Sequence, residues 1–140
     1  MVHHVFAYGS LMVPAVMRAV TGKLFSSEEA KLEGFARYLV AEQVHPGIVP
    51  ALGHHVAGRL YLDIDQDSLK QLDYFESDIY LRQAVEVELP EGDMVEAFAY
   101  VVGERHRSLL SDQSWDEAEF IQRHLPGFLS RVSGWMQESD

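Results

Sequence analysis

The sequence predicts an α+β fold in which a mixed, curved sheet or small barrel is flanked by helices. Period-2 alternation of apolar residues marks the central strands, and apolar residues at helical spacing mark one helix among the strands and closing helices at the end. No internal repeat, low-complexity run or flexible linker interrupts the 140 residues. We therefore expect a single domain over residues 1–140.

The N-terminal segment predicts a strand, a turn and a helix. His4 to Tyr8 is a short, β-rich run, and it ends at Gly9 and Ser10, which permit a sharp turn. Pro14 suits the first turn of a following helix. The apolar residues at helical spacing after it are Val16, Met17 and Val20.

The next segment contains two predicted strands around a predicted loop. Residues 33–41 form a strand region that Gly34 interrupts, and residues 45–50 (HPGIVP) form a rigid, proline-bracketed loop. The second strand alternates, with Arg59, Tyr61 and Asp63 on one face. The other face carries Val56, Gly58, Leu60, Leu62 and Ile64.

A helix over 67–76 and a hairpin are predicted next. Leu69, Leu72 and Phe75 form the apolar face of the helix. In the first hairpin strand, the apolar residues Ile79, Leu81, Val85, Val87 and Leu89 alternate with Tyr80, Arg82, Glu86 and Glu88. After a turn at 90–93, the second strand covers 95–102.

The C-terminal segment predicts packing helices. Ser114 and Glu117 have the spacing of a capping box, and Pro126 ends or restarts the helix. The acidic end at 138–140 is expected to be a frayed terminus. The apolar spacing includes Phe120, Ile121, Phe128, Val132 and Trp135.

Composition excludes several functional classes. The net charge of −11, from 22 acids against 11 bases, disfavours binding to nucleic acid and to anionic lipid. The absence of cysteine excludes disulfides, thiolate catalysis and cysteine-ligated zinc. No apolar stretch approaches the roughly 18 residues of a membrane span. We also expect no signal peptide, because the N-terminal residues lack a basic region followed by a hydrophobic core. We expect a cytoplasmic protein without a membrane or nucleic-acid partner.

Glu76 is the first candidate catalytic residue, because it is an acid that projects between Leu69 and Leu72 on an apolar helix face. Burial and the negative end of the helix would raise its pKa toward neutrality, as a general base requires. The alternative is a glutamate at a frayed helix end whose carboxylate reaches water.

The turn of Tyr8, Gly9, Ser10 and Leu11 is the second candidate. Its free N–H groups would cluster near the positive end of the following helix and could bind a carboxylate or phosphate. The alternative is an ordinary strand-to-helix turn in which Ser10 bonds its own backbone.

Four segments, in this order and spacing, resemble the γ-glutamylcyclotransferase-like family, which includes the plant avirulence-induced-gene proteins. The segments are FAYGSLM at residues 6–12, HPGIVP at 45–50, VAGRLYLD at 56–63 and LDYFESDIYLRQAVEV at 72–87. The resemblance covers roughly residues 5 to 102. Two departures stand out: Ser77 follows the acid where the family commonly has Gly, and His45 opens the proline segment where a Tyr is frequent.

The resemblance implies a small mixed β-barrel flanked by helices and an acyltransferase-type cyclisation that eliminates an amine. The N–H groups of Gly9, Ser10 and Leu11 would bind the α-carboxylate of a small-molecule γ-glutamyl substrate. Glu76 would shuttle the proton while 5-oxoproline forms, without metal or cofactor. Further substrate-binding candidates are Tyr8, Tyr80, Arg82 and Tyr100.

Two other classes of function remain open at this stage. A non-catalytic ligand-binding or protein-interaction module could use the same scaffold, since fold does not settle function. A histidine metal site at His3-His4 and His54-His55 is the other. Adjacent residues of a strand point to opposite faces, and these pairs lack a spaced acidic partner, which disfavours the metal site.

Overall fold

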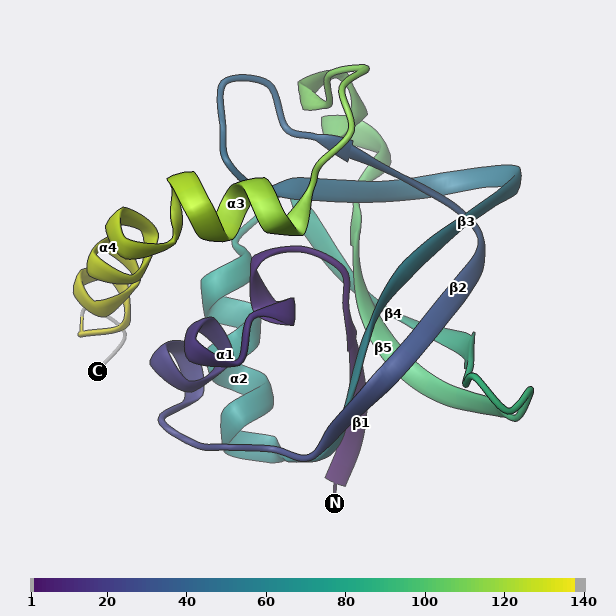
Figure 1. The fold of residues 1–140 in the computed structure, drawn as a ribbon, viewed down its shortest axis with the longest axis horizontal. Helices are drawn as coiled ribbons and strands as arrows, with labels where there is room; N and C mark the ends of the chain where they lie inside the picture. Colours follow the sequence, from purple (N-terminus) through teal and green to yellow (C-terminus); the bar gives the residue numbers. More distant parts are fainter. Residues whose placement is uncertain (1, 138–140) are drawn as a thin grey trace.

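The computed structural model describes residues 2–137, which form five strands, four α-helices and two 3₁₀ helices (Figure 1). In chain order they are β1 (Val2–Ala7), η1 (Ser10–Met12), α1 (Pro14–Thr21), β2 (Ser27–Leu39), β3 (Pro46–Asp65), α2 (Gln66–Glu76), β4 (Tyr80–Glu88), β5 (Met94–Val102), η2 (Glu104–Leu109), α3 (Glu117–Arg123) and α4 (Leu125–Gln137).

The strands close into a barrel in the order β1-β3-β2-β4-β5. Neighbouring strands are antiparallel except β1 and β5, which run parallel where Val5 is paired with Phe98. In Figure 1, α1, α2, α3 and α4 lie on one side of the strands. The structure therefore confirms the predicted α+β class with a small mixed barrel flanked by helices.

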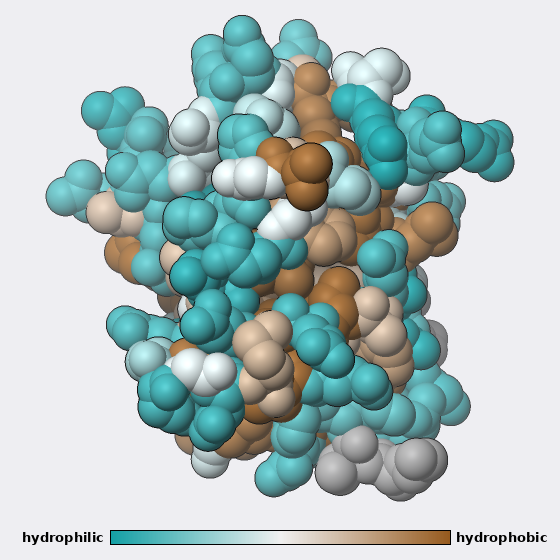
Figure 2. All heavy atoms as spheres, turned by 90° about the vertical axis from the view of Figure 1, so that its right-hand side faces the viewer, coloured by the Kyte–Doolittle hydropathy of each residue, from teal (hydrophilic) through white to brown (hydrophobic). Residues whose placement is uncertain are grey.

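Two apolar clusters fill the fold. One contains residues of all five strands, such as Phe6, Leu32 and Val87, and it fills the barrel. The other, which includes Val5 and Phe128, lies between the barrel and the helices. β1 is thus buried on both faces. On the side away from the helices, apolar side chains gather at the centre of the surface among hydrophilic ones (Figure 2).

The predicted loop at residues 45–50 is wrong, because Pro46 begins β3, which extends to Asp65 with a register shift against β2 between Glu33 and Phe35. The first residue of a strand tolerates proline, which has no N–H to donate. Gly47 fits there because a Cβ would overlap the side chain of Val102. The paired strand β2 also begins earlier than predicted, at Ser27.

One face assignment in β3 is also wrong. Ile64 was predicted to share the face of Val56, but it lies with Tyr61 in the cluster under the helices. The register of β1 against β3 shifts between His3 and Val5. Such a bulge moves the following side chains to the opposite face of the sheet.

The burial of β4 reverses along its length. Val85 and Val87 are buried in the barrel, as their alternation predicts. At the other end, Tyr80 is buried in the cluster under the helices, whereas Leu81 is 63% exposed. At the start of β4, the face that carries Tyr80 therefore packs toward the helices, and the face that carries Leu81 does not. The predicted hairpin of β4 and β5 is confirmed.

The helix ends follow local capping chemistry. The helix predicted over 67–76 is α2, where the Asp65 carboxylate accepts a 3.1 Å hydrogen bond from the N–H of Ser68. The predicted capping box at Ser114 and Glu117 is wrong, since the Asp116 carboxylate accepts from the Ala118 N–H and caps α3. The helix that follows α3 is α4, which begins at Leu125, next to Pro126. The predicted frayed end at 138–140 lies outside the described residues.

Candidate active site

The turn after β1 is shaped by close packing against the start of β3. Gly9 links Tyr8 to the 3₁₀ helix η1, and a Cβ at Gly9 would lie 2.8 Å from Cδ and Cγ of Pro46. That separation is too short for a real side chain, so the turn requires glycine for its proximity to Pro46. The proline segment and the glycine turn, distant in sequence, are therefore packed together.

Every carbonyl of this turn accepts a hydrogen bond within the protein. Two bonds come from side chains: Arg37 Nη1 donates to the Tyr8 oxygen at 2.8 Å, and the Tyr61 hydroxyl donates to the Leu11 oxygen at 2.7 Å. The Gly9 and Ser10 oxygens accept from backbone N–H groups one turn ahead. The orientation of all four peptide units is thereby fixed.

The N–H groups of the same turn are left open. Across residues 2–137, no backbone or side-chain acceptor bonds the N–H of Gly9, Ser10 or Leu11. Ser10 and Leu11 are nevertheless buried. Three adjacent N–H donors at the start of a helical turn form a site that can hold a carboxylate or phosphate.

Glu76 is the last residue of α2, and its side chain is half-buried. Burial raises the pKa of its carboxyl group from 4.5 to about 8, and the nearby Asp73 carboxylate contributes to this rise. The next residue, Ser77, has φ 67° and ψ −169°, a backbone region that only glycine adopts readily. A glycine at this position would adopt the backbone that ends the helix without strain.

Asp73 connects α2 to the hairpin. The Tyr100 hydroxyl donates to its Oδ1 at 2.7 Å, and Arg82 Nη1 donates to its Oδ2 at 2.9 Å. The Arg82 guanidinium also lies 4.9 Å from the centre of the Phe98 ring. Arg82 is thus occupied in holding Asp73 beside Glu76.

Tyr8 and Tyr80 also form hydrogen bonds in the walls of the site. Tyr8 donates its hydroxyl hydrogen to the Tyr100 carbonyl at 2.6 Å, and Tyr80 donates its own to the Pro46 carbonyl at 2.8 Å. His45 Nδ1 lies 3.1 Å from the Tyr80 oxygen, so that nitrogen must carry the hydrogen of the bond. Burial raises the pKa of the Tyr8 and Tyr80 phenols, which keeps them neutral.

The open turn and the acid face one cavity of about 640 Å³. All the candidate residues from the sequence line it except Arg82, which is paired with Asp73: Tyr8, Gly9, Ser10, Leu11, Glu76, Tyr80 and Tyr100. The cavity thus joins free N–H donors to a carboxyl group with a pKa near neutrality. Such an arrangement can bind an anionic group and transfer a proton.

A comparison with known protein families identifies the family of this chain. Residues 5–117 match the model of the family described as gamma-glutamyl cyclotransferase, AIG2-like. The chain belongs to this family. The match includes the turn, the acid and the hairpin.

Relatives within the family include plant and animal proteins. AIG2-like protein D of Arabidopsis thaliana is 33% identical over 97% of this chain and 90% of its own length. The crystal structure of an AIG2-like protein from Mus musculus is 28% identical, with a TM-score of 0.65 over 82% of this chain and 88% of that one. A gamma-glutamyl cyclotransferase is 16% identical, with a TM-score of 0.63 over 94% and 86%, which shows a shared fold.

Several cavity residues of this family member were not singled out by sequence reasoning. Glu42, Gln43 and His45 line the cavity from the connection between β2 and β3. Arg37 supports the turn from behind, and its guanidinium stacks 5.3 Å from the centre of the Trp115 ring. Only His45 carried a signal, as a departure from the family's usual tyrosine.

Two further features of the described residues bear on function. No group of three or more histidine, aspartate or glutamate side chains among them is arranged to hold a metal ion. No helix within residues 2–137 has the length and apolar character to cross a membrane.

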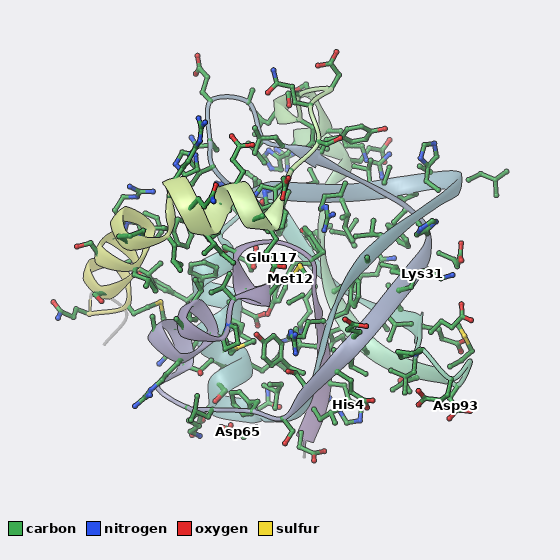
Figure 3. All side chains as sticks on the ribbon, in the orientation of Figure 1. His4, Met12, Lys31, Asp65, Asp93 and Glu117 are labelled. Carbon is green, nitrogen blue, oxygen red and sulfur yellow. The ribbon has the colours of Figure 1, made fainter. Side chains whose placement is uncertain are left out.

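A second cavity, of about 480 Å³, shares no lining residue with the first. Its lining includes Met12, Lys31 and Glu117, which Figure 3 labels. Lys31 is paired with Glu33 at 3.1 Å and with Glu88 at 3.6 Å, so its charge is already balanced.

Proposed function

We propose that this protein is a γ-glutamylcyclotransferase-type enzyme that releases 5-oxoproline from a γ-glutamyl amine or amide. One observation supports this most strongly: the unbonded N–H groups of Gly9, Ser10 and Leu11 line the same cavity as Glu76, whose pKa is raised to about 8. A γ-glutamyl group needs an anchor for its α-carboxylate and a proton acceptor near its α-amine. This cavity offers both.

The reaction is an internal displacement. The nitrogen of the α-amine forms a bond to the γ-carbonyl carbon, which closes a five-membered ring. The bond between that carbon and the amide nitrogen then breaks, and 5-oxoproline and an amine are released. Binding the α-carboxylate at the turn restricts the rotations of the glutamyl chain, so the two reacting atoms are held close together.

Glu76 serves as the proton carrier in this proposal. Its ionised form takes one proton from the α-ammonium, and the free amine then attacks. The resulting acid returns that proton to the leaving nitrogen, and the second proton that the ring nitrogen loses is taken up by the departing amine, which leaves as an ammonium ion. A pKa of about 8 suits both steps, because a group that titrates near the working pH can accept a proton and release it again. The proton is conserved over the cycle, and the step requires no additional reactant.

The proposal is tested by incubating the purified protein with a panel of γ-glutamyl compounds and measuring 5-oxoproline. Glu76→Gln keeps the shape of the side chain but removes the base, and we expect turnover to fall by about 10²–10⁴-fold. Glu119→Gln, at an exposed acid of α3 outside the cavity, is the matched control and should keep full turnover. Full activity of Glu76→Gln would rule out this mechanism.

The same assay separates the enzyme from the binding-module alternative. If the wild-type protein binds γ-glutamyl compounds in the cavity and releases no 5-oxoproline from any of them, the scaffold serves binding alone.

A further inference from the structure

The lining of the cavity that holds the turn and Glu76 contains no positively charged side chain among the described residues. A carboxylate bound to the N–H groups of Gly9, Ser10 and Leu11 would lose part of its hydration. Removing a charge from water is costly when no opposite charge balances it. A side chain that balances such a ligand must therefore act from outside the lining.

Arg37, on β2, is placed to supply that charge. Its Nη1 donates to the Tyr8 carbonyl at 2.8 Å and to the Ala57 carbonyl at 3.1 Å. Among the described residues, no carboxylate lies within 4.0 Å of its guanidinium. By contrast, three other basic side chains are each paired with a carboxylate: Lys23, Lys31 and Arg82.

The guanidinium of Arg37 is held in place and partly removed from water. It lies 5.3 Å from the centre of the Trp115 ring, whose Nε1 donates to the Val44 carbonyl at 3.0 Å. Burial lowers the pKa of Arg37 and Glu117 opposes this change, but an arginine side chain stays protonated in a protein. Because Arg37 is half-buried, water screens its charge less than that of an exposed side chain.

The peptide unit between Tyr8 and Gly9 connects this cation to the open turn. The unit is trans, so the Tyr8 carbonyl and the Gly9 N–H point in opposite directions. The N–H is therefore directed away from the guanidinium, and Gly9 lines the cavity whereas Arg37 does not. A charged donor on the carbonyl also strengthens the N–H as a donor, because hydrogen bonds in series polarise one another.

This peptide unit differs from the next two in the turn. The carbonyls of Gly9 and Ser10 accept hydrogen bonds from neutral backbone N–H groups. The Tyr8 carbonyl accepts from a cation, so the Gly9 N–H is the open donor on which a positive charge acts most directly.

We propose that Arg37 is a positioning residue of this site: through the peptide unit between Tyr8 and Gly9, it directs the Gly9 N–H into the cavity and stabilises the α-carboxylate of a bound glutamyl group. This inference rests on the proposed function, which assigns that carboxylate to the turn. It concerns the anchoring of the ligand and not the proton transfer at Glu76. Loss of the Arg37 charge should therefore weaken the binding of a ligand that has the carboxylate and spare a ligand that lacks it.

A matched pair of ligands tests the proposal, because 5-oxoproline and 2-pyrrolidinone share a lactam ring and differ by one carboxylate. NMR titration of the isotope-labelled protein measures the dissociation constant of each. We expect the wild-type protein to bind 5-oxoproline at least about tenfold more tightly. Arg37→Met should remove most of this preference, whereas Arg37→Lys keeps the charge and should retain it. Arg59→Met removes a half-buried arginine of β3 outside the cavity and should leave the preference unchanged.

The outcomes separate a positioning role from a merely structural one. Arg37→Met should weaken the binding of 5-oxoproline alone; weaker binding of both ligands to the same extent, or of neither, overturns the proposal. Equal binding of the two ligands by the wild-type protein, or no binding of either, overturns it as well. If Arg37→Met does not fold, the neutral variant Arg37→Gln is measured in its place with the same expectation.

These titrations need no turnover, so they separate this inference from the proposed function. If γ-glutamyl compounds yield no 5-oxoproline, the proposed reaction fails, and the carboxylate preference still decides the role of Arg37. If they do, Arg37→Met should raise KM with little change in kcat, because the anchor is held in the ground state and the transition state alike. A fall in kcat at unchanged KM would contradict the assignment.

Discussion

The raised pKa of Glu76 predicts a distinctive dependence of stability on pH. Below pH 4.5 the carboxyl group is protonated in the folded and the unfolded chain, so a change of pH in this range does not alter the free energy of unfolding through Glu76. Between pH 4.5 and about 8, the unfolded chain releases this proton while the folded protein retains it. The contribution of Glu76 to stability is therefore complete at low pH and is lost as the pH rises toward 8.

The size of this loss follows from the interval between the two pKa values. Each pH unit within it changes the free energy of unfolding by about 1.4 kcal/mol, which gives an upper bound of about 5 kcal/mol. Because the Glu76 side chain is half-buried, water screens part of this cost, and we expect a change of about 2–3 kcal/mol. Glu76→Gln has no titrating group at this position and should lack the change.

Urea unfolding at pH values of about 5, 7 and 9 measures the effect. The free energy of unfolding of Glu76→Gln, relative to the wild-type protein, should increase steadily over this series. Glu119→Gln should show a constant difference from wild type, since Glu119 lies exposed on α3. A difference between Glu76→Gln and wild type that is the same at every pH would refute the assignment of a half-buried carboxyl group with a raised pKa.

Three further substitutions test the surroundings of the cavity. Ser77→Gly should raise the free energy of unfolding by about 1 kcal/mol in urea unfolding, because the φ of 67° favours glycine; a loss of stability would contradict this. Gly9→Ala should weaken binding of γ-glutamyl compounds at least about tenfold by calorimetry, since its Cβ would press on Pro46; unchanged affinity would show that the turn does not bind them. Tyr61→Phe should cost about 1 kcal/mol of stability and lower turnover, because it removes the hydroxyl that holds the Leu11 carbonyl; turnover equal to wild type would exclude a positioning role.

The sequence was most informative where structure depends on neighbouring residues. The spacing of Leu69 and Leu72 predicted α2, and the structure ends that helix at Glu76. The loop predicted at residues 45–50 failed because two prolines and a glycine normally mark a turn. In the structure, the position of Gly47 depends on a close contact with Val102, which is more than fifty positions away. The periodicity of the sequence does not indicate contacts at such a separation.

The candidate site was likewise predictable from the sequence only in part. The sequence named the turn at Gly9 and the acid at Glu76 separately, and only the folded chain shows that they line one cavity. Arg82 shares a strand with Tyr80, yet it is turned to Asp73 instead of the cavity. Glu42 belongs to a connection without an apolar pattern, so no local signal could indicate its place in the lining.

The cavity between the Gly9 turn and Glu76 is lined by residues from Phe6 to Trp135, so both ends of the described chain contribute to it. A nascent polypeptide emerging from the ribosome cannot complete this chamber until α4 has been synthesised. The Tyr8 hydroxyl, which bonds the Tyr100 carbonyl, must likewise wait for a partner made much later. Such a contact order slows folding, because the entropy of closing long loops is lost before the contacts that reward it can form.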